Sequence, residues 1–244
     1  MDSKELFLTD HMDDLRKRLI ITAAAFCIFF LLGFIYVEDI YQWFVRNLEF
    51  KLIVLGPSDI IWIYVMLAGL IALIGTIPVL SLEIWLFIKP GLKPKERKYA
   101  LMYVPALFIL FILGLAFGYF VILPTIFDFL VGLSGDLVLI HFTVEKYFQF
   151  IMNITLPFGF LFELPVVVLF LTSLGIVNPN ILKKMRKYAY FVLGIIATVI
   201  SPPDFLSEIL VLIPLLFLYE ISIILSKLVF RKNAVKAKEA ELRG

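Results

Sequence analysis

The uncharged stretch LIITAAAFCIFFLLGFIYV, residues 19–37, decides the fold. It follows the basic triplet Arg16-Lys17-Arg18 and ends before the acidic pair Glu38-Asp39. An apolar run of about 18 residues or more is long enough to cross the hydrocarbon core of a bilayer as an α-helix. The run is too long for a secretory signal peptide and lacks its small-residue cleavage site. We therefore expect it to be retained as a first membrane-spanning helix.

Composition extends this conclusion from one segment to the whole chain. Of the 244 residues, 62% are hydrophobic and 17% are charged, against a usual apolar share of about 45–50% and a charged share of about 25%. Further apolar runs lie at residues 60–88, 99–123, 147–177, 188–200 and 205–226. The sequence predicts an all-α polytopic membrane protein, a single domain with six transmembrane helices and a basic tail at residues 227–244.

Prolines and length modify the later helices. Pro124 is expected to end the third helix, because proline breaks the helical hydrogen-bond ladder, and residues 124–146 are expected to form an outer loop. The fourth run is interrupted by Pro157, Glu163 and Pro165. The fifth run would make a helix of about 20 Å at 1.5 Å per residue, against a hydrocarbon core of about 30 Å. The fifth and sixth helices are therefore expected to be short or re-entrant.

The basic residues predict the orientation. Of the 22 Lys and Arg residues, only Arg46, Lys51 and Lys146 lie outside four segments. The four basic segments are residues 1–18, 89–98, 183–187 and 227–244. Because cytoplasmic loops carry the excess of Lys and Arg, we expect both termini to be cytoplasmic, in the inner membrane. The net charge of +2 conceals this segregation of basic residues and does not indicate nucleic-acid binding.

Catalysis and metal binding find little support. The two histidines, His11 and His141, fall on opposite sides of the expected membrane, and Cys27 is the single cysteine. No HExxH, GxSxG or paired-cysteine motif is present. We expect no enzymatic activity, no cofactor and no metal site.

Acidic residues within the apolar runs are the candidate polar sites. An ionised carboxylate in the middle of a span costs on the order of 3 kcal/mol by insertion scales, and Glu163 lies in such a position. In one interpretation Glu163 is a functional polar site, which water reaches because Pro157 and Pro165 bend the helix. In the other, its carboxylate is satisfied by internal hydrogen bonds. Glu83 and Glu220 lie nearer helix ends, where a side chain reaches water at a lower free-energy cost. For these two residues we therefore expect a structural role at least as much as a functional one.

Two acids on the expected cytoplasmic side lie among basic residues. Asp14 precedes Arg16-Lys17-Arg18, and Glu96 lies between Lys95 and Arg97. Clusters of acidic and basic residues of this kind commonly lie on the solvated surface of the protein beside the membrane. The alternative is a site for a cationic ligand, and paired arginines would suit it, since a guanidinium makes a bidentate contact with a carboxylate.

Five short motifs, in order along nearly the whole chain, resemble the TatC family. They are HMDDLRKRL at 11–19, WLFIKPGL at 85–92 with KER at 95–97, FELP at 162–165, SPPD at 201–204 and YE at 219–220. The resemblance implies a receptor of the twin-arginine translocase, which binds the twin-arginine signal peptides of folded precursors. It also implies partnership with the single-span subunits TatA and TatB, contact with membrane lipid, self-association and transport driven by the protonmotive force.

The resemblance assigns site residues as well. The signal-binding acids of the family fall on Glu96 and Asp14, with Phe87 as an apolar contact. Arg16 and Arg18, in the same segment as Asp14, are assigned to the same signal-peptide site. Asp14 stands where the family more usually has glutamate, so its side chain is shorter by one methylene.

Further positions of the family fall on the second half of the chain. Glu163 matches the intramembrane glutamate, and Asp204 matches the outer-loop aspartate. Thr198, Ser201 and Glu208 match polar positions at which partner transmembrane helices dock. A fifth helix shorter than the hydrocarbon thickness would thin the bilayer or admit water, which suits a place where folded cargo crosses.

Two other functions remain open from the sequence alone. A proton-coupled small-solute transporter would use Glu163 as its coupling site, although the few helices and the lack of an internal repeat disfavour it. A purely structural membrane scaffold is the third possibility, and for it neutral substitutions of Glu96 would be silent.

Overall fold

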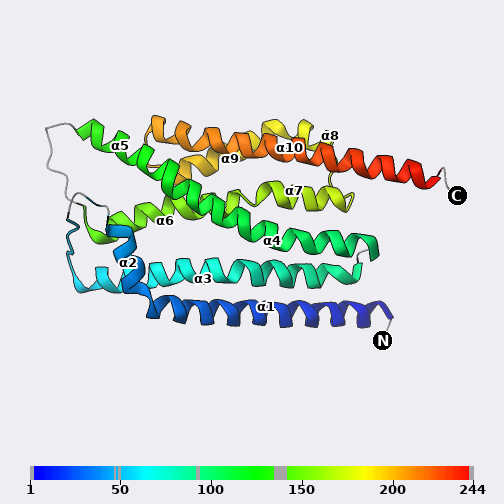
Figure 1. Cartoon of the computed structure of the whole chain (residues 1–244), viewed down its shortest axis with the longest axis horizontal. Coiled ribbons are helices and arrows are strands. Elements are labelled where there is room, and N and C mark those ends of the chain that lie inside the picture. Colours follow the sequence, from blue (N-terminus) through cyan, green and yellow to red (C-terminus); the bar gives the residue numbers. More distant parts are fainter. Residues whose placement is uncertain (1–2, 47, 49–50, 92–93, 135–141, 242–244) are drawn as a thin grey trace. The chain divides into compact units, whose positions relative to one another are not determined.

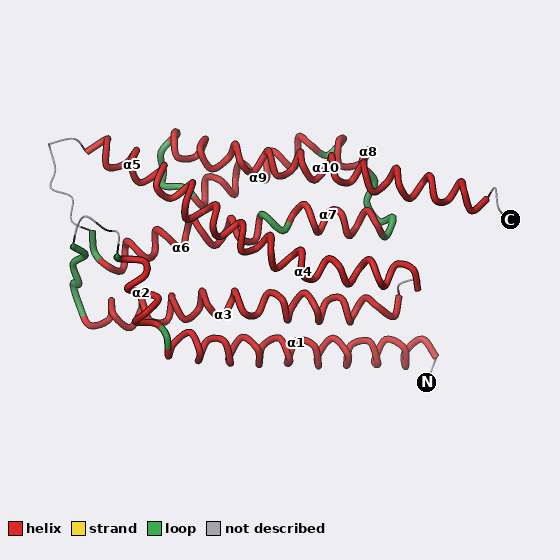
Figure 2. The backbone as a smooth tube through the Cα atoms, in the orientation of Figure 1, coloured by secondary structure: helices red, strands yellow, loops and turns green. Residues whose placement is uncertain are grey.

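The computed structural model describes residues 3–46, 48, 51–91, 94–134 and 142–241. The side chains of residues 3–11, 94–100, 133–134 and 232–241 lie outside that description. Within the described ranges the chain is helical apart from short connections and one parallel bridge between Ile53 and Thr143 (Figure 2). The predicted all-α class is confirmed.

The helices follow the apolar runs (Figure 1). In chain order the elements are α1 (Ser3–Ile35), α2 (Val37–Val45), α3 (Pro57–Ile88), the 3-10 turn η1 (Lys89–Gly91), α4 (Pro94–Phe117), the π-helical turn η2 (Gly118–Ile122), α5 (Leu123–Ser134), α6 (Val144–Leu161), α7 (Leu164–Ser173), α8 (Pro179–Lys184), α9 (Arg186–Ile200) and α10 (Phe205–Glu241).

Five helical segments of the described chain are long and apolar enough to cross a membrane. They are Met12–Ile35, Pro57–Gly91, Leu101–Gly132, Val144–Ser173 and Phe205–Arg231. The chain is therefore a multi-pass membrane protein. Helix α9, with 15 residues, measures about 22 Å at the α-helical rise and is the short fifth helix that the sequence predicts. Whether α9 and α10 cross the membrane completely stays a prediction.

The sixth helix is longer than expected. Helix α10 begins at Phe205, as predicted, but it has 37 residues and continues to Glu241. The predicted bounds of this span, 205–226, are therefore shorter than the helix, and the basic tail is helical as far as Glu241. Residues 234–241 read AVKAKEAE, and Ala, Lys and Glu are strong helix formers, so the helix continues beyond the apolar run.

Pro124 does not end the third helix. The chain passes from α4 through the π-helical turn η2 into α5, which runs to Ser134, so the outer loop expected from residue 124 begins later. Pro124 is the second residue of α5, directly after the wider π turn. At the start of a helical segment the missing N–H of proline costs little.

The fourth run is broken where the sequence predicts it. Helix α6 ends at Leu161 and α7 begins at Leu164, and Figure 2 draws a loop between them. Pro165 is among the first residues of α7, where proline is tolerated. Glu163 therefore lies at a break between two helices and not inside one.

The chain divides into two compact units, each described by itself. Unit 1 comprises Met1–Phe108 with His141–Gln149, and unit 2 comprises Ile109–Ile140 with Phe150–Gly244. The expectation of a single domain stays a prediction.

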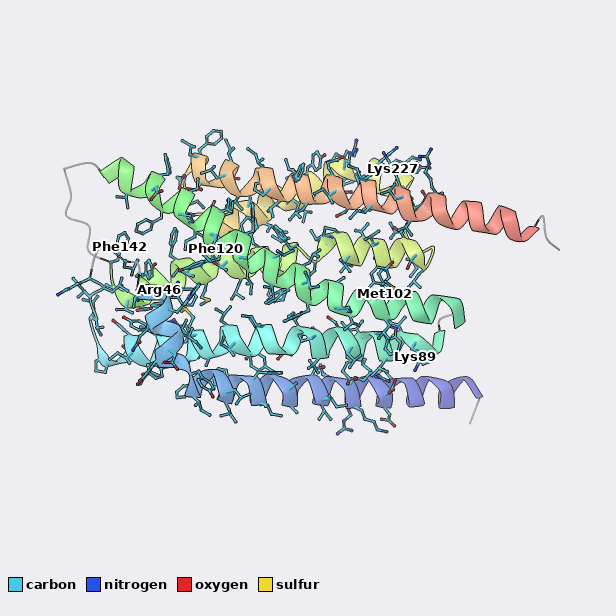
Figure 3. The ribbon with its side chains drawn as sticks, viewed as in Figure 1. Arg46, Lys89, Met102, Phe120, Phe142 and Lys227 are labelled. Carbon is cyan, nitrogen blue, oxygen red and sulfur yellow. The ribbon has the colours of Figure 1, made fainter. Side chains whose placement is uncertain are left out.

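In unit 1, α1 and α3 lie side by side and run antiparallel (Figure 1). Arg18, near the start of the apolar part of α1, meets Glu83 near the end of α3, and Gly33 near the end of α1 approaches Ala68. The basic segment before the apolar part of α1 and Lys89 after α3 therefore lie at the same end of the pair. Arg46 and Lys89 lie at opposite ends of unit 1 (Figure 3).

Unit 2 is held by close helix approaches and short polar bonds. Gly114 and Gly118 of α4 and η2 face the backbone of Phe158 and Thr155 in α6, which permits helices to approach closely. The hydroxyls of Thr172 in α7 and Ser226 in α10 share a hydrogen bond of 2.8 Å. Helices α9 and α10 are antiparallel, since Arg186 pairs with Glu220 and Thr198 with Glu208.

The Gly33 contact gives a test of the α1–α3 packing. A Cβ at position 33 would lie 2.9 Å from the carbonyl oxygen of Ala68, whereas a Cβ at Gly69 meets nothing within 4 Å. We expect Gly33→Ala to lower stability by about 1–3 kcal/mol through overpacking. Gly69→Ala should leave stability unchanged or raise it slightly, because alanine is the better helix former.

Thermal unfolding in detergent, followed by the loss of monodisperse protein, measures the difference. Equal midpoints for the Gly33 and Gly69 variants would show that α1 and α3 do not pack at this distance.

Candidate functional site

Three charged side chains form a connected cluster at the basic end of unit 1. The Arg18 Nε donates to Oδ2 of Asp14 at 3.0 Å, and its Nη1 donates to Oε2 of Glu83 at 3.0 Å. Asp14 and Arg18 are one turn apart on α1, so they share a face, and Glu83 comes from the last turns of α3. We call Asp14, Arg18 and Glu83 the charge triad.

Exposure differs along the charge triad. The Asp14 side chain is 38% exposed, that of Arg18 is 19% exposed and that of Glu83 is 11% exposed. A buried carboxylate is costly unless it is paired, and Arg18 supplies that pairing. Asp14 is the member that an incoming ligand can reach most readily.

The other residues assigned to signal binding are placed less fully. Phe87 is half-buried and lies one turn beyond Glu83 on α3, so these two residues share a face of the helix. Arg16 is exposed on α1. The backbone of Glu96 belongs to α4, and its side chain lies outside the described residues. The structure therefore brings Asp14 and Arg18 together and leaves the place of the Glu96 carboxylate a prediction.

The contact between Arg18 and Glu83 was missed by the sequence analysis. The two residues are 65 positions apart, and no local pattern pairs them. The available signal was topological: an acid in the last turns of one apolar helix and an arginine at the start of another, both at the basic side of the membrane. Antiparallel neighbours bring two such positions together.

Glu163 occupies the break between α6 and α7. Its N–H donates to the Phe160 carbonyl at 3.1 Å, and its carbonyl accepts from the Val167 N–H at 3.0 Å, so the backbone is satisfied. Its carboxyl oxygen Oε1 is buried without a hydrogen-bond partner among the described residues. Burying such a group without a partner costs several kcal/mol. A site of this kind favours a proton, water or a polar group of a ligand.

The turn between α9 and α10 gathers the residues predicted for partner docking. The Thr198 hydroxyl donates to the Glu208 carboxylate at 2.6 Å. Asp204 caps α10, because its Oδ2 accepts from the Ser207 N–H at 2.7 Å. Ser201 is buried. The Ser201 and Ser207 hydroxyls and Oδ1 of Asp204 are buried without partners in the part of the chain that the structure describes.

The opposite ends of α9 and α10 carry a second ion pair. Arg186 donates to Oε2 of Glu220 at 2.5 Å, and the Tyr190 hydroxyl donates to Oε1 at 2.6 Å. The Tyr219 hydroxyl donates to the Leu182 carbonyl at 2.9 Å. These bonds tie α8, α9 and α10 together, which is a structural role for Glu220.

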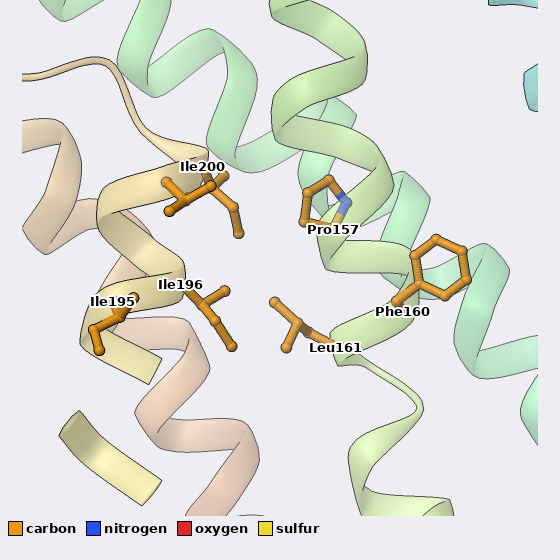
Figure 4. Close-up of a pocket in the computed structure, with 7 residues that line it drawn as sticks. Pro157, Phe160, Leu161, Ile195, Ile196 and Ile200 are labelled. Carbon is orange, nitrogen blue, oxygen red and sulfur yellow. The ribbon is translucent and has the colours of Figure 1, made fainter. Parts of the chain in front are cut away.

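An apolar hollow of about 330 Å³ lies between α6 and α9 in unit 2 (Figure 4). Its lining has no charged residue and consists of Pro157, Phe160, Leu161, Ile195, Ile196, Val199 and Ile200. Such a surface accepts hydrocarbon. No three His, Cys, Asp or Glu residues of the described chain are grouped closely enough to hold a metal ion.

Comparison with known proteins identifies the family. The family model for the Sec-independent protein translocase protein TatC matches residues 10–214. TatCd of Bacillus subtilis is 50% identical over 96% of this chain and 96% of its own length. TatCy of the same species is 42% identical over 99% of this chain and 96% of its own. TatC of Halalkalibacterium halodurans is 39% identical, covering 100% of this chain and 98% of its own.

A solved structure agrees with the sequence relatives. The crystal structure of the twin-arginine translocase receptor TatC superposes with a TM-score of 0.79 at 32% identity, covering 90% of this chain and 99% of the other. The match runs across both compact units, and it confirms the resemblance carried by the five sequence motifs. The chain belongs to the TatC family of Sec-independent protein translocase proteins.

Proposed function

We propose that this chain is the receptor subunit of a twin-arginine translocase and binds the twin-arginine signal peptides of folded precursors. The similarity to a solved TatC receptor over 90% of the chain carries the proposal. The half-exposed Asp14 carboxylate, just before the apolar part of α1, supplies a matching surface, because carboxylates are the natural partners of guanidinium groups. The comparisons favour this function over a proton-coupled small-solute transporter.

Signal binding in this proposal combines several weak contacts. Asp14 and Glu96 each accept hydrogen bonds from one guanidinium of the twin-arginine motif, and Phe87 contacts an apolar side chain of the peptide. Exposed ion pairs contribute only about 0–1 kcal/mol each. Affinity therefore depends on the two acids and the apolar contact acting together.

The partner subunits TatA and TatB dock, in this proposal, on α9 and α10. Polar groups inside a membrane associate with polar groups of neighbouring helices. The proposal takes Thr198, Ser201 and Glu208 as these groups; in the free chain Thr198 is bonded to Glu208 and Ser201 is buried. On α9 the side chains of Phe191 and Val199 are 69% and 79% exposed, so the helix offers apolar surface as well. Membrane lipid and a second copy of the chain are the other proposed neighbours.

The intramembrane Glu163 and the outer-loop Asp204 belong, in this proposal, to the transport step. The Glu163 carboxyl group, at the break between α6 and α7, binds a proton or a polar group of a partner. Asp204 holds the turn before α10 by its capping bond. The short α9 favours local thinning of the bilayer, which lowers the barrier to a large cargo beside the receptor.

The proposed location is the inner membrane with both termini in the cytoplasm. The antiparallel packing of α1 on α3 brings Arg18 to Glu83, two turns from Lys89. Likewise Arg186 meets Glu220, two turns before Lys227. Arg18 and Lys89 in unit 1, and Arg186 and Lys227 in unit 2, thus each lie at one end of their helix pair, which the positive-inside rule assigns to the cytoplasm.

Substitution of Glu96 tests the proposed signal site. The affinity for a twin-arginine peptide should fall in the order wild type, Glu96→Gln, Glu96→Ala, because Gln keeps one hydrogen-bond acceptor without the charge. The Ala variant should lose about 1 kcal/mol or more, roughly fivefold, because Lys95, Arg97 and Lys98 then repel the ligand. The wild-type advantage should shrink as salt screens the site.

Solubilised full-length protein, titrated with a labelled twin-arginine peptide and its twin-lysine counterpart, gives these affinities. Equal binding of both peptides by the wild type would refute the receptor function. Unchanged peptide crosslinking and export in the Ala variant, at normal abundance, would return Glu96 to a solvated surface role and favour the structural scaffold.

Glu163 gives a prediction for transport. Glu163→Gln keeps shape and hydrogen-bonding capacity, whereas Glu163→Leu removes both. We expect the Gln variant to retain more export of a twin-arginine reporter than the Leu variant, with both inserted at wild-type abundance. Full export by the Leu variant would show that transport does not need this carboxyl group.

Cysteine labelling tests the orientation. In a Cys27→Ala background, cysteines at Lys51 and Pro203 should react with an impermeant maleimide from outside the cell, and cysteines at Gly91 and Lys184 should not. All four positions are exposed. Outside labelling at Lys184 would overturn the assignment. Protection of position 203 alone would make α9 and α10 a re-entrant hairpin.

A further inference from the structure

We propose that Glu83, a residue outside the proposed peptide-binding set, keeps the signal-peptide site negatively charged by neutralising Arg18. The proposal rests on the proposed function, since it takes Asp14 as a carboxylate that the peptide meets. Glu83 acts through Arg18 and does not itself touch the ligand. It is therefore a positioning residue, and the property that it sets is the charge presented by Asp14.

The need for Glu83 follows from the position of Asp14. Arg18 is one turn away on the same helix and donates to Oδ2 of Asp14 at 3.0 Å. A carboxylate that forms an ion pair with a neighbouring guanidinium is neutralised by it. Such a neutral pair attracts a second guanidinium only weakly. By itself, Arg18 would compete with the arginines of a signal peptide for Asp14.

Glu83 changes this balance. Its Oε2 lies 3.0 Å from Nη1 of the same guanidinium. Asp14 and Glu83 each carry one negative charge and Arg18 carries one positive charge, so the charge triad has a net charge of −1. Arg18 contacts Asp14 through Oδ2, so Oδ1 is the oxygen that an incoming guanidinium would meet.

Burial separates the two acids by role. The Glu83 side chain is 11% exposed and the Asp14 side chain is 38% exposed, so a peptide at the surface reaches Asp14 and not Glu83. The low local exposure also reduces screening of the Glu83 charge by water and salt. Asp13, Arg16 and Lys17 on the same helix are exposed, so their charges act through water and are screened more strongly.

Charge substitutions within the charge triad test the proposal. Glu83→Gln keeps a hydrogen-bond acceptor for Arg18 but brings the net charge to zero. A unit charge about 8 Å from the ligand, at an effective dielectric constant of about 40, changes affinity by roughly fivefold. We expect Glu83→Gln to weaken twin-arginine peptide binding by about that factor and to lessen its dependence on salt.

A second substitution separates charge from packing. Arg18→Gln together with Glu83→Gln restores the net charge of −1, so the double variant should recover most of the lost affinity. Arg18→Gln alone brings the net charge to −2 and should bind at least as tightly as the wild type. A structural role for the ion pair predicts the opposite, since each further substitution would then lower affinity or stability.

The control is Glu220→Gln, which removes the charge of the matching acid in the Arg186 pair of unit 2 and should leave peptide affinity unchanged. All variants are measured as full-length protein in nanodiscs against the twin-arginine and twin-lysine peptides. Wild-type affinity in Glu83→Gln, or no recovery in a folded double variant, would overturn this inference and leave the receptor function standing. If the wild type does not discriminate the two peptides, the proposed function itself fails.

Discussion

Hydrocarbon cannot hydrogen-bond, and this constraint governs the whole structure. Backbone groups in the membrane must be satisfied inside helices, so the long apolar runs become the five helical segments that can span. Charged side chains near these segments must be paired or must reach water. Arg18 meets this requirement between Asp14 and Glu83, and Arg186 meets it at Glu220. The Arg18–Glu83 and Arg186–Glu220 pairs also help to fix which helices are neighbours, because each of these two pairs joins two antiparallel helices of one unit.

The departures from regular helix have identifiable causes and lie beside polar residues. The π-helical turn Gly118–Ile122 precedes Pro124 and lies where Gly118 approaches Thr155, and π turns are frequent at functional sites. The break between α6 and α7 leaves the buried Oε1 of Glu163 without a partner among the described residues. In the proposed function this break provides the polar position at Glu163 that takes part in transport.

The charge triad connects stability with recognition. A basic membrane end is required for topology, yet a receptor for paired arginines needs a negative surface at that same end. In the proposed receptor the charge triad meets both demands locally: Arg18 is paired with the buried Glu83, and the more exposed Asp14 is left for the peptide. Electrostatic complementarity of this kind contributes more to selectivity than to raw affinity. Under the same proposal, a carboxylate that is followed by Arg16, Lys17 and Arg18 still attracts a cation.

The sequence alone determined the properties that depend on local composition. The apolar run at 60–88 becomes α3 (Pro57–Ile88), the short run at 188–200 becomes α9, and the predicted break falls at Glu163, because run length and proline act within a few residues. Five motifs were enough to indicate the family. Only the tertiary structure decided that the helix continues past Pro124, that Glu83 joins Arg18, and that Thr198 joins Glu208. The physical reason is that these outcomes depend on how helices pack, and the packing register of residues far apart in the chain leaves no local signal in the sequence.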